Sequence, residues 1–234
     1  VWNTRQHTLH ILQPWTFPGR EGEVTPVFVY TDYPEVELFI NGKSQGRRTK
    51  DSSVTMAETE NDEARKALTR QKRYRLMWMD TRYEPGTVRA VAYDTEGRVA
   101  AETEVQTAGK PYALRLTPEE GTTLHAGSED LCFVRVEVVD KQGRLCPNAA
   151  HEITFEVQGA SARFRAAANG DATCLHQFHK PVMPAFSGQL TAIVEATEKS
   201  GEAKLVAKAK SLKSAKIAIK TVGLMHNAQC TMHN

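Results

Sequence analysis

Apolar and polar residues alternate along most of the chain, in short runs that are separated by turn residues. In residues 153–157, Ile, Phe and Val alternate with Thr and Glu, and in residues 190–195 Leu, Ala and Val occupy every second position. Successive side chains of a β-strand point to opposite faces, so a period of two predicts strands with one buried face. The chain is therefore expected to be all-β, with antiparallel sheets.

The first half of the chain contains a hairpin signal and one insertion. Asn41-Gly42 is the preferred dipeptide of a type I′ turn, because both central residues need a positive φ, and it joins two of the runs. Residues 57–70 lack a period of two and are rich in Ala, Glu, Lys and Arg, which favours a short exposed helix or a mobile loop between strands. The strands expected in this half are 7–13, 25–31, 36–40, 43–48, 74–78, 87–94 and 98–106.

The alternation stops between Thr107 and Ala113, where Gly109 and Pro111 interrupt it, and this break marks the expected domain boundary. Short strands separated by turns, as in the second half, are typical of an immunoglobulin-like sandwich. We predict two consecutive immunoglobulin-like antiparallel β-sandwiches, at residues 1–108 and 109–220, and a frayed tail at 221–234. The strands expected in the second half are 113–118, 131–140, 152–158, 161–168, 189–198, 203–210 and 214–220.

Composition and charge narrow the classes of partner. The chain has 30 Lys and Arg against 28 Asp and Glu, a net charge of +2, which gives no electrostatic argument for binding nucleic acid or a membrane. No apolar run approaches the roughly 18 residues that a transmembrane helix needs. The first residue is Val1, and no signal peptide follows it, so we expect a piece of a longer protein.

Motifs of common enzymes are missing from the sequence, including GxSxG, HExxH, the Walker loop and the dinucleotide-binding glycines. Each Asp and Glu stands alone on a polar strand face or in a turn, so no glycosidase pair of carboxylates is identified. His176 and His179 lie in a Pro-flanked segment and are expected to be solvated loop residues. The motif AANGDAT at 167–173 offers cation ligands or a turn, and the turn is favoured. No metal or cofactor is predicted.

The least generic segment is the loop at residues 14–23, PWTFPGREGE. Trp15 and Phe17 precede the charged residues Arg20 and Glu21. Aromatic faces beside hydrogen-bonding charges are suited to binding a sugar or to docking on another domain. Alternatively, Trp15 plugs the end of its own sandwich. We weigh docking and plugging equally, ahead of direct contact with a ligand.

Longer strings carry a resemblance to a known family over residues 5–219. They stand at residues 10–31, 36–48, 74–94, 113–120 and 133–149, and the first reads HILQPWTFPGREGEVTPVFVYT. In their order they resemble the C-terminal region of Bacteroides-type β-galactosidases of glycoside hydrolase family 2. The first half is similar to the domain of unknown function that follows the catalytic barrel, and the second half to the terminal sandwich domain.

The resemblance implies a parent enzyme that is a retaining glycoside hydrolase, with two catalytic glutamates in a barrel upstream of Val1. Neither glutamate is carried over, so this chain is expected to be no enzyme by itself. The resemblance further implies that the chain consists of non-catalytic accessory domains. These would pack on the barrel of the same polypeptide, shape substrate access through residues 15–23, or mediate contacts in an oligomer of unknown size. It also implies a periplasmic or secreted location.

Two other functions stay open at this point. One sandwich is a carbohydrate-binding module that uses Trp15 or Phe17, with Trp78 expected in the core because it shares a strand face with Tyr74 and Leu76. The other alternative is an adhesive surface domain, which rests on analogy of fold alone.

Overall fold

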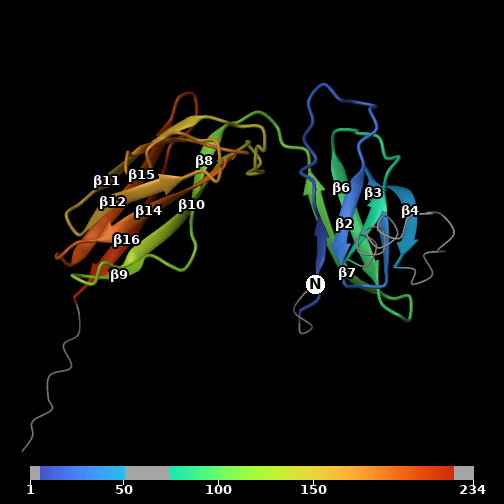
Figure 1. Ribbon diagram of the computed structural model, residues 1–234, viewed down its shortest axis with the longest axis horizontal. Coiled ribbons are helices and arrows are strands. Elements are labelled where there is room, and N and C mark those ends of the chain that lie inside the picture. The colour runs from blue at the N-terminus through green and yellow to red at the C-terminus, as the bar shows by residue number, and fades with distance from the viewer. Residues whose placement is uncertain (1–5, 51–73, 224–234) are drawn as a thin grey trace, which may run out of the picture. The chain divides into compact units, whose positions relative to one another are not determined.

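The computed structural model describes residues 6–50 and 74–223, and the chain divides into two compact units, Val1–Thr107 and Ala108–Asn234. Every named element is a β-strand, so the expected all-β class is confirmed (Figure 1). Within the described ranges no helix is long and apolar enough to cross a membrane. The insertion at 57–70 lies outside the described residues.

The first unit is a sandwich of two antiparallel sheets. The smaller sheet has the order β1-β2-β5 and the larger sheet the order β4-β3-β6-β7. Side chains from both sheets share one buried cluster, which includes Val29, Leu38 and Val88. The strand bounds are β1 (Leu9–Ile11), β2 (Val27–Thr31), β3 (Glu35–Ile40), β4 (Lys43–Thr49), β5 (Arg75–Trp78), β6 (Thr87–Tyr93) and β7 (Val99–Gln106).

The hairpin predicted at Asn41-Gly42 is confirmed, with φ of 49° and 79° at the two residues. The Asn41 side chain also ties the turn to β6, because its Oδ1 accepts a hydrogen bond from the Thr87 backbone N–H at 2.8 Å. A Cβ at Gly86 would lie 1.9 Å from this Oδ1. Glycine at position 86 is therefore required by the close approach of Asn41.

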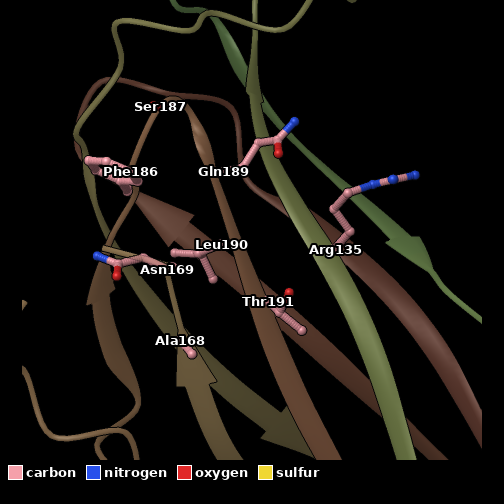
Figure 2. Close-up of a pocket in the computed structure, with 9 residues that line it drawn as sticks. Arg135, Ala168, Asn169, Phe186, Ser187, Gln189, Leu190 and Thr191 are labelled. Atoms are coloured by element: carbon pink, nitrogen blue, oxygen red, sulfur yellow. The ribbon is translucent and has the colours of Figure 1, made fainter. Parts of the chain in front are cut away.

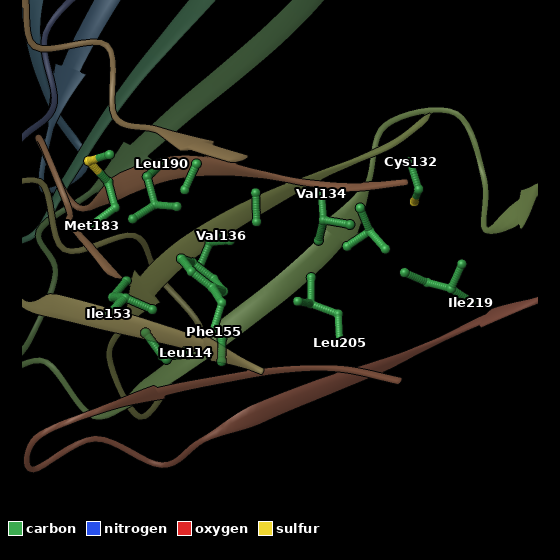
Figure 3. Packing of buried hydrophobic residues seen from close by; sticks show 14 of the residues in the cluster. Leu114, Cys132, Val134, Val136, Ile153, Phe155, Met183, Leu190, Leu205 and Ile219 are labelled. Carbon is green, nitrogen blue, oxygen red and sulfur yellow. The ribbon is translucent and has the colours of Figure 1, made fainter. Parts of the chain in front are cut away.

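The second unit is a larger sandwich, with sheets in the orders β12-β14-β10-β8 and β13-β11-β15-β16-β9. Its buried cluster lies between the sheets and contains Cys132, Val134, Ile153 and Leu205 (Figure 3). The strand bounds are β8 (Ala113–Pro118), β9 (Thr123–His125), β10 (Leu131–Val139), β11 (Glu152–Gln158), β12 (Ala162–Ala168), β13 (Val182–Pro184), β14 (Gln189–Ala196), β15 (Gly201–Ala209) and β16 (Ala215–Val222).

Three features of the second unit differ from the sequence-based expectation. Strands β9 and β13 were not predicted, since three residues are too few to show a period, and prolines flank or end β13. Strand β9 pairs in parallel with β16, while the other strand pairs in this unit are antiparallel. Strand β16 runs to Val222, and the buried Thr221 hydroxyl donates to the Ser161 carbonyl oxygen at 3.0 Å. The frayed tail was therefore placed too early at 221, and residues 224–234 lie outside the described residues.

Candidate functional site

The loop at residues 14–23, here called the aromatic loop, packs against Tyr83. The ring centroids of Trp15 and Tyr83 are 5.2 Å apart, and Phe17 lies 6.1 Å from Trp15 and 5.4 Å from Tyr83, all with edge-on geometry. The Trp15 indole Nε1 donates to the Glu84 carbonyl oxygen at 2.8 Å, and the Thr107 hydroxyl donates to the Trp15 carbonyl oxygen at 2.6 Å. Trp15 thereby closes one end of its own sandwich.

Backbone hydrogen bonds join the aromatic loop to the segment around Tyr83. The Gly22 N–H donates to the Tyr83 carbonyl oxygen at 2.8 Å, and the Tyr83 N–H donates to the Glu23 carbonyl oxygen at 2.9 Å. Sequence analysis did not identify Tyr83 as a partner, because it lies some sixty residues away and no local pattern links the two segments. The adjacent Glu-Pro-Gly turn was the only available signal.

The charged residues of the loop are oriented by the loop itself. The Arg20 guanidinium lies 5.8 Å from the Phe17 ring centroid, and its Nε is 2.8 Å from Glu23 Oε2. Glu21 accepts a hydrogen bond from the Gly19 N–H at 3.3 Å. Both charged side chains are exposed, and contacts within the loop set their direction.

The four site residues expected from the sequence therefore come together but differ in access. Trp15 is 1% exposed, so neither face of its ring is open to a sugar or another domain. Phe17 is half-buried, and Arg20 and Glu21 are exposed. The accessible side chains of the aromatic loop are the half-buried Phe17, two prolines and the charged residues Arg20, Glu21 and Glu23.

A shallow cavity of about 300 Å³ in the second unit was not anticipated from the sequence (Figure 2). Arg135 of β10 lies opposite Thr191 of β14 in the register, and Phe186, 48% exposed, also lines the cavity. The Arg135 Nε is 3.9 Å from carboxylate oxygens of Glu119 and Glu137, so it is only loosely paired. The guanidinium of Arg135 and the ring of Phe186 lie on opposite sides of this open cavity, and its lining includes no carboxylate pair suited to hydrolysis (Figure 2).

The AANGDAT motif borders this cavity and forms a turn. Asn169 Oδ1 accepts from the Asp171 N–H at 3.1 Å, and Asp171 Oδ1 accepts from the Thr173 N–H at 2.8 Å. Of Asn169 and Gly170, only Gly170 has a positive φ, 78°. The favoured turn is confirmed, and the Asn169 side chain caps it.

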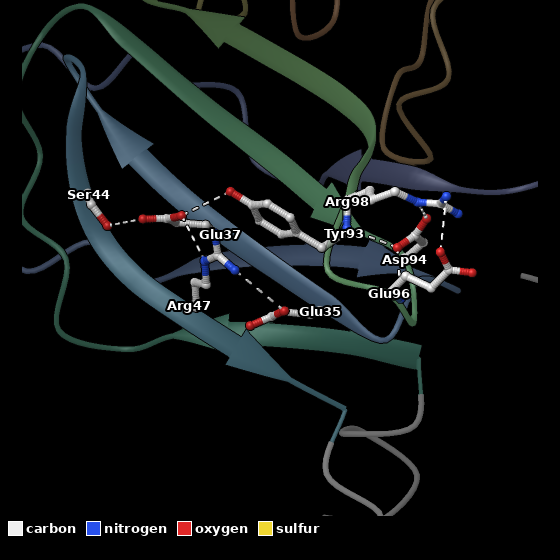
Figure 4. A network of polar contacts seen from close by, with 8 residues as sticks. All are labelled: Glu35, Glu37, Ser44, Arg47, Tyr93, Asp94, Glu96 and Arg98. Carbon is white, nitrogen blue, oxygen red and sulfur yellow. Dashed lines mark hydrogen bonds and ion pairs between the residues drawn. The ribbon is translucent and has the colours of Figure 1, made fainter.

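Carboxylates of the first unit pair with arginines and do not stand alone (Figure 4). Arg47 Nε lies 3.1 Å from Glu37 Oε2, and its Nη1 lies 3.7 Å from Glu35 Oε2. The Tyr93 hydroxyl also donates to Glu37 at 3.1 Å. The expectation of isolated carboxylates was wrong here, since residues i and i+2 of β3 share one face and the arginine of β4 reaches both.

These partners hold the carboxyl groups in the ionised form. The Ser44 hydroxyl donates to Glu37 at 2.6 Å and lowers the pKa of that carboxyl, and Arg47 and Tyr93 act in the same direction against burial. In the second unit, the hydrogen bond from Arg163 lowers the pKa of Glu195. Among the described residues, every Asp and Glu with a resolved shift has a lowered pKa. The general acid of a glycosidase needs the opposite shift.

The histidines and cysteines form no evident metal site. Within residues 6–50 and 74–223, no group of three or more His, Cys, Asp or Glu is placed to hold a metal ion. His176 lies in the segment between β12 and β13, with its Nδ1 3.6 Å from the Cys174 sulfur.

Comparisons with known proteins match each of the two sandwiches to a known domain. Residues 114–218 match the family described as glycoside hydrolase family 2 C-terminal domain 5, and residues 22–101 match a domain of unknown function, DUF4982. The chain is 36% identical over 219 residues to the β-galactosidase BoGH2A of Bacteroides ovatus, covering 93% of this chain and 23% of that protein. A putative β-glucuronidase of Formosa agariphila is 32% identical over 67% of this chain and 13% of its own length.

Solved structures that resemble this chain also include Bacteroides glycosidases. A β-glycosidase from Bacteroides vulgatus has a TM-score of 0.77 at 28% identity, covering 92% of this chain and 24% of that one. A family 2 glycosyl hydrolase from Bacteroides cellulosilyticus has a TM-score of 0.76 at 27% identity. The chain spans about a quarter of the length of these relatives. The chain thus belongs to the C-terminal domains of glycoside hydrolase family 2, of the type found in Bacteroides proteins.

Proposed function

We propose that this chain is the non-catalytic accessory region of a family 2 glycoside hydrolase of the β-galactosidase type. The two sandwiches pack on the catalytic domain of the same polypeptide and support its substrate-binding side. The observation that carries the proposal is the state of the carboxyl groups: those with resolved shifts have lowered pKa values, and those of β3 are bound by Arg47. A retaining glycosidase needs one carboxyl group that is protonated near neutral pH and a second one facing it across a cleft.

The relatives support the division of labour between this chain and the rest of the protein. This chain accounts for 23% of the length of the Bacteroides ovatus β-galactosidase that it resembles. An enzyme of that length has room for a separate catalytic domain outside the matched region. From the resemblance alone we also infer a periplasmic or secreted location, which fractionation of the source cells tests.

Carbohydrate binding through the aromatic loop has weaker support than the accessory role. The proposal that Trp15 stacks on a sugar conflicts with its burial, and the remaining ring, Phe17, is half-buried against Tyr83. Stacking of a sugar needs an open aromatic face. Phe17 and the exposed charged residues Arg20, Glu21 and Glu23 are the part of the loop that stays available for such a role.

The proposed function is tested by assaying the 234-residue chain beside its full-length parent. Both are incubated with aryl β-galactosides and aryl β-glucuronides, and binding of the same sugars is followed by calorimetry. We expect turnover by the parent alone and no heat of binding for the chain. Turnover by the chain that is abolished in Glu35→Gln or Glu37→Gln overturns the proposal. Sugar binding that is lost in Phe17→Ala, with Phe39→Ala as the control, replaces it with the binding module.

A further inference from the structure

The outer face of the small sheet in the first unit is apolar and aromatic. It is formed by the outward residues of β1, β2 and β5 and by the residue after β1, and we call it the β1-β2-β5 face. Leu12 is 47% exposed, and Met79, directly after β5, is 54% exposed. The face contains one arginine and one histidine and no Lys, Asp or Glu. Its members are His10, Leu12, Phe28, Tyr30, Arg75 and Met77.

Arg75 lies on the edge strand β5 of this face and reaches over two rings of the central strand β2. Its guanidinium carbon lies 5.1 Å from the Phe28 ring centroid and 5.9 Å from that of Tyr30, and its Nη1 donates to the Tyr30 hydroxyl at 3.3 Å. Its Nε is buried and has no hydrogen-bond partner among the described residues. Because the Nε is covered by the chain itself, an acceptor on a docking surface can reach this half-buried side chain only at its terminal Nη atoms.

The outer face of the larger sheet, on the opposite side of the same sandwich, carries charged residues that pair with one another. Arg47 joins Glu35 and Glu37 there, and Arg89 lies 3.1 Å from Glu102 (Figure 4 shows the Arg47 group). Two rings on this face lie under guanidinium groups of the same sheet: Phe39 lies 4.9 Å from Arg89, and Tyr93 lies 3.8 Å from Arg47. Charges that pair within one sheet need no partner, whereas aromatic residues, Met and Arg without Lys or Glu are the composition enriched at protein interfaces.

The position of the matching region within its relatives indicates which domain covers the β1-β2-β5 face. Residues 114–218 match a C-terminal domain, and the chain covers 23% and 24% of two relatives, so most of such a polypeptide precedes this region. The preceding chain enters through β1, which is an edge strand of this sheet. A covalent tether gives a high effective concentration, so a patch of modest size is enough for stable docking.

We propose that the β1-β2-β5 face docks on the preceding domain of the same polypeptide, with Arg75 donating to an acceptor on that domain. The inference rests on the proposed function and deepens it by naming the surface. The partner is an apolar patch that carries a carbonyl or carboxylate oxygen within reach of Arg75.

Methionine oxidation by dilute peroxide tests the proposal with probes already in the chain. Met77 and Met79 lie on or beside the face, and Met183, fully buried in the other unit, reports unfolding of that unit alone. Hydrogen exchange in residues 6–50 and 74–107 reports unfolding of the first unit. Exposed methionines oxidise faster than buried ones. We expect Met77 and Met79 to oxidise about tenfold more slowly, or slower still, in the full-length parent than in the 234-residue chain. Equal rates in the two proteins overturn the proposal.

Two matched variants separate docking from general effects of truncation. Phe28→Gln and Phe39→Gln each remove a partly buried ring that lies under an arginine, on opposite faces of the same sandwich. In the parent, Phe28→Gln is expected to restore fast oxidation of Met77, and Phe39→Gln is expected to leave it slow. Restoration by both variants, with hydrogen exchange of the first unit still slow, contradicts a role for this particular face.

The remaining outcomes keep the inference distinct from the proposed function. Protection of Met79 that rises with the concentration of the 234-residue chain alone assigns the face to a second copy and overturns the proposal. If the 234-residue chain has no hydrolase activity, and Met77 oxidises equally fast in the chain and in the parent, only the docking face is overturned. A chain that hydrolyses galactosides by itself overturns the proposed function, whatever the oxidation rates show.

Discussion

The two sandwiches fill their cores with different side chains. The buried cluster of the first unit includes two tryptophans and a tyrosine, Trp15, Trp78 and Tyr83, among mostly Val and Ala. The cluster of the second unit is larger and consists of Val, Ala, Leu and Ile with Phe155, two cysteines and Met183, and within the described residues it has neither Trp nor Tyr. The smaller core therefore depends on a few large rings, and the larger core on many small contacts.

The rings of the first unit also hold loops. The Trp78 indole Nε1 donates to the Gly46 carbonyl oxygen at 3.1 Å, and the Trp15 indole donates to Glu84. Each indole thus joins core packing to a hydrogen bond on a neighbouring segment, as buried tryptophans commonly do. A small sandwich buries a smaller fraction of its surface, so the loss of one such residue matters more there.

The largest expected effect is that of Trp78→Ala. Deleting a fully buried tryptophan leaves a large cavity and an unpaired Gly46 carbonyl, which together cost about 3–5 kcal/mol. A loss of that size is enough to unfold a small domain. Hydrogen exchange read separately for the two units should show loss of protection in residues 9–106, with residues 113–222 still protected. Equal loss in both units contradicts the independence of the two cores.

Leu205→Ala is expected to be the next largest change, now in the second unit. Leu205 is fully buried between the sheets, and a leucine-to-alanine change of this kind costs about 2–5 kcal/mol. Because many residues share the larger core, the unit should stay folded with a lower midpoint in urea. If Leu205→Ala unfolds the second unit at neutral pH without denaturant, its core depends on a few residues, as that of the first unit does.

Trp15→Phe tests the hydrogen-bonded role of an indole while keeping most of its volume. The Glu84 carbonyl loses its partner, and the expected cost is about 1–3 kcal/mol. The backbone bonds between Gly22 and Tyr83 should exchange faster than in the unchanged protein. Phe17→Leu, which removes no indole donor, serves as the control, and an equal effect of both variants assigns the stability to ring packing alone.

Much of this fold is encoded locally. The run at 113–118 coincides with β8, and the Asn-Gly turn fixes β3 and β4, because alternation and turn chemistry are properties of neighbouring residues. The buried face of β10, from Cys132 to Val138, follows the same rule. Strand β9 pairs with a strand almost a hundred residues further along the chain, and its three residues carry no local pattern.

The candidate site shows where this local information ends. Composition singled out Trp15 and Phe17, but their burial depends on Tyr83, which is brought in by tertiary packing. The pairing of Glu35 and Glu37 with Arg47 depends on the register of β3 and β4, which includes a bulge. Residue type therefore indicated which side chains were candidates for a site. Only the tertiary packing and the strand register showed which of them are already buried or paired within the fold.

The smallest expected effect concerns the Glu37 group of the first unit and its dependence on pH. The pKa of Glu37 is lowered in the folded state, chiefly by the Ser44 hydroxyl, so the folded form binds this proton less readily than the unfolded chain does. Its contribution is present above the ordinary glutamate pKa of 4.5 and is lost as the pH falls through the lower folded value. Ser44→Ala should reduce the free energy of unfolding of the first unit by less than about 1 kcal/mol at pH 7. The difference from the unchanged protein should vanish in strong acid, where Glu37 is protonated in both states.

Gln45→Ala serves as the control, because Gln45 lies on the same strand and its side chain donates to the Lys43 carbonyl oxygen and not to a carboxylate. Its effect on the free energy of unfolding should not depend on pH. A pH-independent effect of Ser44→Ala would show that the hydroxyl stabilises the strand without acting through Glu37.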